Sequence, residues 1–220
     1  TTVQAGIDAA ASAGAGCEVW VAEGRYPIHQ GSRLDTVSLR HGVAVYGGFA
    51  GDETQRDGVE PRKHPTVLDG RNAADPDLRV YHVVTAQGTT EAVLDGFVIT
   101  GGLANGQGFF GHDYGAGLYA YSAAITVSRC VFVDNEAIGH GGGLYTYDSS
   151  ASTIQGCVFT LNTASRGGGL SNNADSPDLR DCVFAGNSAS QGAGMQHNAG
   201  SPLVSSCVFA GNFGSGEGGG

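Results

Sequence analysis

The sequence predicts an all-β protein folded as a single right-handed parallel β-helix with a short N-terminal α-helical cap. The first observation behind this prediction is a phrase, Cys-Val-Phe-x-x-Asn, that begins at Cys130, Cys157, Cys182 and Cys207. These cysteines are 27, 25 and 25 residues apart, and a glycine cluster follows each phrase. The second observation is that the repeat contains no segment long enough, and free enough of turn residues, to form a helix. Repeats this short bury a core only by stacking on one another, so one continuous solenoid is expected.

Residues 1–13 are expected to form the capping helix. Val3, Ile7 and Ala10 fall on one helical face, and Thr1 and Gln4 have the spacing of a capping box. Repeat arrays need a cap over the core of their first repeat, and a short amphipathic helix supplies one.

Residues 17–102 are expected to form coils of irregular length. Segments rich in β-forming residues and bounded by turn residues occur at 18–24, 43–48, 66–70, 81–84 and 93–102. The last segment aligns with the repeat if Gly96 takes the place of the cysteine. The step from Gly96 to Cys130 is then 34 residues, which predicts a loop inserted at 106–114.

Residues 103–220 are expected to form regular coils of about 25 residues. Each coil is expected to contain three short parallel strands, and roughly nine coils spaced about 4.8 Å apart fit the whole chain. The cysteine and phenylalanine of each phrase are predicted to point inward and the valine between them outward, because residues two apart share a face. The asparagine is predicted to take a left-handed turn conformation, with side-chain amides bonded from coil to coil. The cysteines are expected to be free, buried thiols, since stacked side chains point the same way.

The C-terminal end is predicted to lack a cap. The chain stops at 218–220, where a further coil is expected to begin. A bare solenoid end exposes apolar core and unpaired strand edges. We therefore expect the native protein to continue, or another chain to cover this end, and self-association through this open edge is one expected partnership.

Composition restricts the partners and the location of the protein. The chain has 38 glycines, a single lysine and a net charge of −10. An acidic rod repels nucleic-acid phosphates and anionic lipid surfaces, and no apolar segment has the length of a membrane-spanning helix. We expect no nucleic-acid binding, no direct membrane insertion, and an extracellular or cell-surface location. Neither a calcium-binding repeat nor a zinc-ligand spacing occurs, so no metal and no cofactor is expected.

The strands that follow the glycine clusters carry the candidate ligand-binding residues. If Leu118, Leu144, Leu170 and Met195 point inward, the residues one and three positions later point outward. The candidates in these outward columns are Tyr119, Tyr121, Tyr145, Tyr147, Asn173 and Asn198. Tyrosine rings stack on apolar faces while their hydroxyls bond polar groups, and sugar rings offer both kinds of surface.

The inserted loop is expected to form a wall beside this face. It contributes the side chains of Phe109, Phe110, His112, Asp113 and Tyr114. The alternative interpretation is that the tyrosines only stack across coils and stabilise the sheet without any ligand.

The glycine cluster followed by Phe-x-x-Asn resembles the paired repeat of the polymorphic outer-membrane proteins. The Phe-x-x-Asn motif occurs at 132–135, 159–162, 184–187 and 209–212, and the glycine motif matches loosely at 142–144 and 168–170. The irregular front half resembles the opening coils of bacterial surface proteins with pectate-lyase-like right-handed β-helices. These resemblances imply a secreted or outer-membrane-associated protein, such as an adhesin or autotransporter passenger. The repeats of that family are structural, so no catalytic residue is carried over.

The sequence favours a structural or adhesive protein that contacts a glycan or a cell-surface partner. Many right-handed β-helices act on acidic polysaccharides, but a lyase needs a base beside a group that neutralises the substrate carboxylate. Lys63 is the only lysine and lies in a proline-rich turn. Two alternatives stay open. One is a polysaccharide lyase or glycoside hydrolase whose catalytic residues lie in irregular or missing coils, and the other is a subunit of a self-assembling filament.

Overall fold

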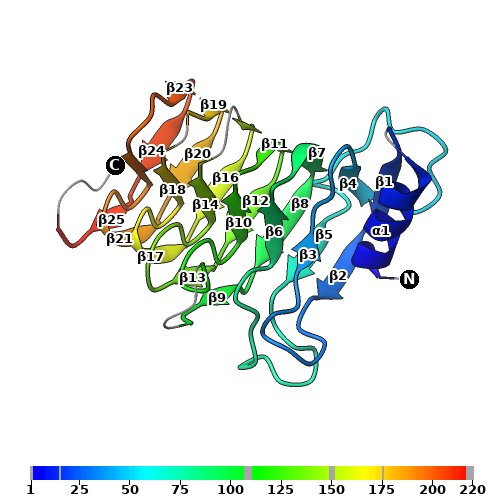
Figure 1. Cartoon of the computed structure of the whole chain (residues 1–220), viewed down its shortest axis with the longest axis horizontal. Coiled ribbons are helices and arrows are strands. Elements are labelled where there is room, and N and C mark those ends of the chain that lie inside the picture. The colour runs from blue at the N-terminus through cyan, green and yellow to red at the C-terminus, as the bar shows by residue number, and fades with distance from the viewer. Residues whose placement is uncertain (1, 15, 107–110, 149–151, 175, 217–220) are drawn as a thin grey trace.

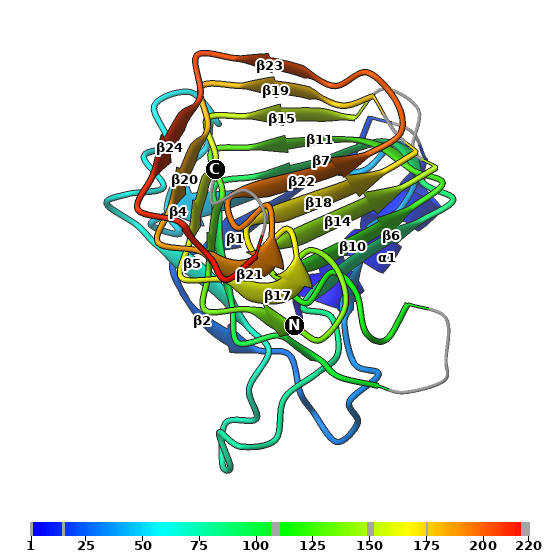
Figure 2. The same cartoon turned by 90° about the vertical axis from the view of Figure 1, so that its left-hand side faces the viewer.

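The protein is an elongated β-solenoid with a helix across one end (Figure 1). The computed structural model describes residues 2–14, 16–106, 111–148, 152–174 and 176–216. Strands of successive coils pair in parallel throughout this part of the chain. Figure 2, viewed toward the C-terminal end, shows the sheets arranged around a common axis. The predicted all-β right-handed parallel β-helix with an N-terminal helix is confirmed.

The described coils build four sheets, which we number in the order in which one regular coil, such as that from β7 to β10, passes through them. Sheet 1 contains β1 (Glu18–Ala22), β4 (Ala44–Phe49), β7 (Thr90–Asp95), β11 (Ala124–Ser128), β15 (Thr153–Gln155), β19 (Asp178–Arg180) and β23 (Leu203–Ser205). Sheet 2 contains β2 (Gly24–Pro27), β5 (Thr66–Asp69), β8 (Phe97–Thr100), β12 (Val131–Val133), β16 (Val158–Thr160), β20 (Val183–Ala185) and β24 (Val208–Ala210). Sheet 3 contains β9 (Leu103–Ala104), β13 (Glu136–Ala137), β17 (Thr163–Arg166), β21 (Ser188–Gln191) and β25 (Phe213–Gly214). Sheet 4 contains β3 (Val37–Ser38), β6 (Val84–Gln87), β10 (Leu118–Tyr121), β14 (Leu144–Tyr147), β18 (Leu170–Asn173) and β22 (Met195–Asn198).

The coil number and the strand number per coil differ from expectation. Sheet 1 has seven strands, so the described chain makes seven coils rather than about nine. The reason is that early coils are long, as the 46 residues between the start of β4 and the start of β7 show. From the third coil onward, a short fourth strand in sheet 3 joins the three that were predicted.

The predicted core columns are confirmed. Cys130, Cys157 and Cys182 are fully buried, and the phenylalanines two residues later stack with ring centroids 4.7–4.8 Å apart. This spacing matches the distance between neighbouring strands, so like residues lie directly above one another. The valines between them are half-buried on the outer face of sheet 2. In the last coil, Phe209 and Phe213 are exposed.

A ladder of asparagines follows sheet 2, and its amides bond from coil to coil as predicted. The Asn135 side chain donates to Asn162 Oδ1 at 3.1 Å, and the Asn162 side chain donates to Asn187 Oδ1 at 3.0 Å. The expectation that these asparagines are themselves left-handed is wrong. The preceding residue takes that conformation, with φ of 55° at both Asp134 and Leu161. The asparagine side chain is thereby turned into the core, where each coil supplies its hydrogen-bond partners.

Gly96 does not occupy the cysteine position. Val98 pairs with Val131, so Phe97 lies beside Cys130 in the core column and Gly96 precedes it. Gly96 has a φ of 80° and aligns with Arg129, whose φ is 48°, so the match is to the left-handed turn before the repeat phrase. A predicted strand at 81–84 is also shifted, because β6 begins only at Val84.

Helix α1 (Val3–Ala13) caps the N-terminal end through the three predicted residues. Val3, Ile7 and Ala10 are buried against the first coil. The N-cap is Thr2, whose hydroxyl accepts a hydrogen bond from the backbone N–H of Ala5 at 3.1 Å. The expected capping box fails because the Gln4 amide reaches across to the backbone of β3 instead, and Thr1 lies outside the described residues.

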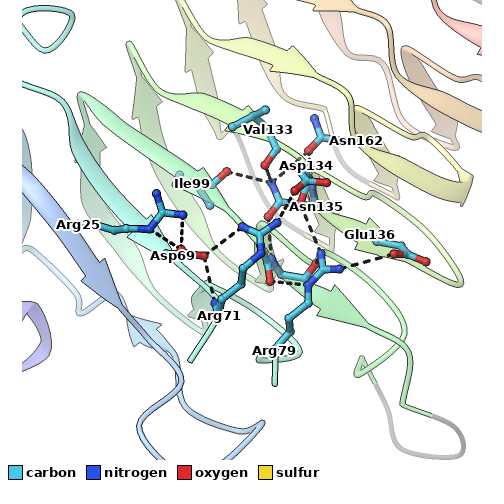
Figure 3. Close-up of polar contacts among 12 residues, drawn as sticks. Arg25, Asp69, Arg71, Arg79, Ile99, Val133, Asp134, Asn135, Glu136 and Asn162 are labelled. Atoms are coloured by element: carbon cyan, nitrogen blue, oxygen red, sulfur yellow. Dashed lines mark hydrogen bonds and ion pairs between the residues drawn. The ribbon is translucent and has the colours of Figure 1, made fainter. Parts of the chain in front are cut away.

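Alternating arginines and carboxylates join the irregular coils to the regular ones (Figure 3). The buried carboxylate of Asp69 accepts hydrogen bonds from Arg25 Nε at 2.6 Å and from the backbone N–H of Arg71 at 3.1 Å. The Arg71 guanidinium also pairs with Asp134, two coils further along the solenoid. Arg79 donates to the carbonyls of residues 101 and 102 in the coil between them. These bonds replace the asparagine ladder where the chain has no asparagine at that position.

The predicted inserted loop lies between sheet 3 and sheet 4. β9 ends 14 residues before β10 begins, whereas β13 ends seven residues before β14 begins. The extra residues therefore fall at 105–117, which agrees with the predicted position. Residues 107–110 of this loop, including Phe109 and Phe110, lie outside the described part of the chain.

The cysteine environment leads to a labelling prediction. All five cysteines are free thiols, and Cys17 and Cys207 are partly exposed whereas the other three are buried. Burial raises the pKa of the Cys157 thiol, which further lowers its reactivity. We expect iodoacetamide at pH 8 to label Cys17 and Cys207 in the folded protein and all five cysteines in urea. Peptide mass spectrometry reads this out, and labelling of Cys157 in the folded protein would contradict the buried column.

Candidate ligand-binding site

Sheet 4 places the candidate residues in two columns on its outer face. Its strands pair in register from β10 through β14 and β18 to β22. The first column contains Tyr119, Tyr145, Ser171 and Gln196, and the second contains Tyr121, Tyr147, Asn173 and Asn198. Leu118, Leu144 and Leu170 on the same strands are buried in the core. The predicted register and the predicted alternation of inward and outward residues are therefore both confirmed.

The two columns differ in exposure, which sequence reasoning did not anticipate. In the second column, 44% of the Tyr121 surface is exposed, Tyr147 and Asn173 are half-buried, and Asn198 is exposed. In the first column, Tyr119 and Tyr145 point away from the core but are only 8% and 3% exposed. All four tyrosines were expected to lie on an open outer face, but two of them are covered.

The inserted loop causes this burial. The Tyr114 ring lies over Tyr145 with centroids 5.0 Å apart, and Gly111 packs so closely on Tyr119 that an added Cβ would lie 2.8 Å from its ring. His140, from the segment before β14, lies against the edge of the Tyr114 ring at 5.1 Å. The described part of the loop thus forms the predicted wall, although it lies on the first column rather than beside it.

Together these residues surround a cavity of about 480 Å³, which we call the tyrosine site. It is lined by Gln87, Gly111, Tyr114, Tyr119, Tyr121, Tyr145, Tyr147 and Asn173. Stacked pairs run along the solenoid axis, with centroids 5.3 Å apart for Tyr121 and Tyr147 and 5.9 Å apart for Tyr119 and Tyr145. Asn198 lies one coil beyond the cavity and donates a hydrogen bond to Asn173 Oδ1 at 3.0 Å.

Sequence comparison places this architecture in a family. A family model described as right handed beta helix region matches residues 83–218, which is more than half of the chain. The chain belongs to the right-handed β-helix family. No match was found among curated proteins or among solved structures. The matched region of this β-helix begins just before β6 and includes every strand that contributes to the tyrosine site.

Gln87 is the residue of the β-helix site that sequence reasoning missed. It pairs with Tyr121 across β6 and β10, one coil before the first tyrosines. Residues 84–87 align with the strands that follow the glycine clusters, and this alignment could have revealed Gln87. The predicted segment at 81–84 placed the strand three residues too early, so Gln87 was left outside it.

The tyrosine site is uncharged at neutral pH. Burial, followed by the neighbouring Tyr145 and Tyr121 rings, raises the pKa of Tyr119 to about 12. Burial likewise raises the pKa of Tyr145. The phenols of Tyr119 and Tyr145 therefore stay protonated and act as hydrogen-bond donors and acceptors. Among the described residues that line the cavity, none carries a charged side chain.

Within the described ranges, no cluster of three or more histidine, cysteine, aspartate or glutamate residues has an arrangement that could hold a metal ion. The same described residues include no helix long and apolar enough to cross a membrane.

Proposed function

We propose that this β-helix is an extracellular or cell-surface adhesive protein that holds a neutral glycan in the tyrosine site. The observation that carries the proposal is the grid of four tyrosines around one cavity of about 480 Å³. This volume falls within the roughly 300–1,000 Å³ typical of ligand pockets. The regular coils supply a rigid support, because each tyrosine is fixed by the strand pairing of its own coil.

The chemistry of the lining supports a sugar as the ligand. Aromatic rings present flat apolar surface for the C–H face of a sugar, and phenol and amide groups at the rim bond its hydroxyls. Tyr121 and Tyr147 are nearly parallel, with an interplanar angle of 8°, and Asn173 continues their column. Cleaving a glycoside needs paired carboxylates, whereas the lining offers rings and amides. These groups are suited to binding a glycan rather than to hydrolysing it.

The surrounding charge and composition support the location and the ligand class. The net charge of −10 disfavours a polyanionic partner. A glycine-rich chain with one lysine is consistent with a secreted or surface-anchored solenoid, as the likeness of its Phe-x-x-Asn repeats to polymorphic outer-membrane proteins also suggests.

Replacement of Tyr121 or Tyr147 by alanine is expected to weaken glycan binding about tenfold each, because an aromatic anchor typically contributes more than 1 kcal/mol. These two tyrosines are preferred to Tyr119 and Tyr145, whose burial makes them necessary for packing. A glycan array identifies the ligand, and titration calorimetry of the best neutral glycan measures the loss.

Tyr46→Ala serves as the matched control. Tyr46 lies on the outer face of sheet 1 beneath the Arg56 guanidinium, away from the tyrosine site. It is expected to leave glycan affinity unchanged. An array without neutral glycan ligands would refute the proposal, and release of products from uronic-acid polymers would replace it with the lyase alternative.

A further inference from the structure

A smaller cavity opens beside the tyrosine site. It has a volume of about 190 Å³ and shares Gln87 and Tyr119 with the tyrosine site. Its other walls include Thr36, Tyr81, His82 and Thr85. The volume lies below the roughly 300 Å³ at which ligand pockets begin. The side cavity is therefore suited to one substituent of a ligand whose main body lies in the tyrosine site.

One wall of the side cavity is aromatic. His82 stacks on Tyr119 with centroids 5.1 Å apart, and Tyr81 stacks on His112 at 4.6 Å. Burial lowers the pKa of His82 to about 4, so its imidazole is neutral at neutral pH. His82 Nδ1 lies 3.1 Å from the carbonyl oxygen of Gly115, and this contact fixes the ring against the inserted loop. The His82 and Tyr119 rings give this wall an uncharged aromatic surface that suits a methyl group.

The opposite wall is polar and lies toward the tyrosine site. Thr36 Oγ1 donates toward the Val83 carbonyl at 3.3 Å and lies 3.4 Å from Thr85 Oγ1, which places two hydroxyls at the cavity. The Gln87 side chain is exposed at the junction of the two cavities. These groups offer a donor and an acceptor to a planar amide that enters from the tyrosine site.

Two side chains of opposite charge, Arg33 and Asp35, face the side cavity, and both already make hydrogen bonds. Arg33 stacks 4.1 Å above Tyr81 and donates to the carbonyls of residues 79 and 103. Asp35 accepts three backbone N–H bonds from residues 30–32 at 2.8–3.0 Å. A carboxylate or an amine on the ligand would be attracted to one of these groups and repelled by the other. A neutral substituent has no such conflict.

We propose that the side cavity receives the acetamido group of an N-acetylated amino sugar, so that the tyrosine site prefers glycans that contain N-acetylhexosamine. The acetamido methyl lies against the His82 and Tyr119 rings, and its amide faces the threonine hydroxyls and Gln87. This inference rests on the proposed glycan binding and adds the class of sugar. It involves no covalent step.

The test compares matched neutral tetrasaccharides by titration calorimetry. The probes are β-linked tetramers of N-acetylglucosamine and of glucose, with N-acetylgalactosamine and galactose oligomers as a second matched pair. We expect the acetylated member of at least one pair to bind about tenfold or more tightly, because a filled pocket with hydrogen bonds contributes more than 1.4 kcal/mol. Equal affinities within both pairs would overturn the inference but leave the proposed function standing. No binding by any of the four probes would also overturn the inference, and the glycan array then decides whether the proposed function stands.

Two variants at one position separate size from chemistry. Thr36→Leu fills the side cavity and is expected to abolish the preference for the acetylated sugar while leaving the affinity for the glucose or galactose oligomer unchanged. Thr36→Val keeps the size of the side chain and is expected to retain a preference of several fold. A preference that persists unchanged in Thr36→Leu would place the acetamido group elsewhere and overturn the inference.

Discussion

Replacing Asn162 by alanine is expected to lower the free energy of unfolding by about 3–5 kcal/mol, since several buried groups lose their partners at once. Asn162 is fully buried and its Oδ1 accepts bonds from the backbone and the side chain of Asn135 at 3.2 and 3.1 Å. Its Nδ2 donates to the Phe132 carbonyl at 2.9 Å and to Asn187 Oδ1 at 3.0 Å. Alanine supplies none of these hydrogen bonds. The space that the shorter side chain leaves is too enclosed for bulk water to replace them.

Asn198→Ala is the matched control for this prediction. The Asn198 side chain also donates a hydrogen bond to the preceding coil, at 3.0 Å to Asn173 Oδ1, but it does so in contact with solvent. Water replaces a bond of this kind, so the expected change is within about 0.5 kcal/mol. Urea denaturation followed by circular dichroism measures both variants. A loss for Asn162→Ala as small as that for Asn198→Ala would show that the ladder does not stabilise the solenoid.

Acidification is expected to destabilise the protein through His82. The folded-state pKa is about 4, compared with 6.5 for an unperturbed histidine, because burial disfavours the charged ring. Between these values the unfolded state binds a proton that the folded state does not, so stability rises with pH. His82 therefore contributes fully above about pH 6.5. Its contribution falls by about 3 kcal/mol as the pH is lowered to about 4.

Two substitutions distinguish the contribution of His82 to the pH dependence of stability from that of the carboxylates that titrate in the same range. His82→Asn keeps an amide donor for the Gly115 carbonyl and removes the titrating ring. His82→Gln moves the donor away from the position of Nδ1. Denaturant unfolding at several pH values should show that both variants lose less stability than the wild type between pH 6.5 and 4, with His82→Gln less stable than His82→Asn throughout. An NMR titration that places the His82 pKa near 6.5 would contradict the prediction.

The regular half of the fold could be predicted because its sequence repeats one local geometry. Cys157, Phe159 and Asn162 each recur at nearly constant steps, so their burial follows from stacking like residues. The left-handed position before the asparagine is occupied by Gly186 and Gly211 in the last two repeats but by Asp134 and Leu161 in the first two, so no single residue type marked it in the sequence. Backbone pairing with the coils on either side imposes this conformation on whatever residue is there.

The candidate site was predicted as a pattern but not as a shape. The columns that contain Tyr121 and Tyr147 follow from the alternation of side chains along a strand. The burial of Tyr119 could not be predicted, because it depends on where a loop of irregular length folds back. The side cavity beside His82 also brings together residues from 33 to 119, which no periodic pattern connects.

The repeat period and the local residue pattern were enough to predict that this chain is a stack of parallel coils, which residues face its core, and which tyrosines share an outer face. These properties depend on residues near one another in the chain and on a period that repeats, so they can be read locally. Three further features became visible only in the folded chain: a loop covers half of the tyrosines, arginines and carboxylates join the irregular coils, and a side cavity adjoins the tyrosine site. These features arise where irregular segments meet, and their geometry is set by packing between residues far apart in the chain.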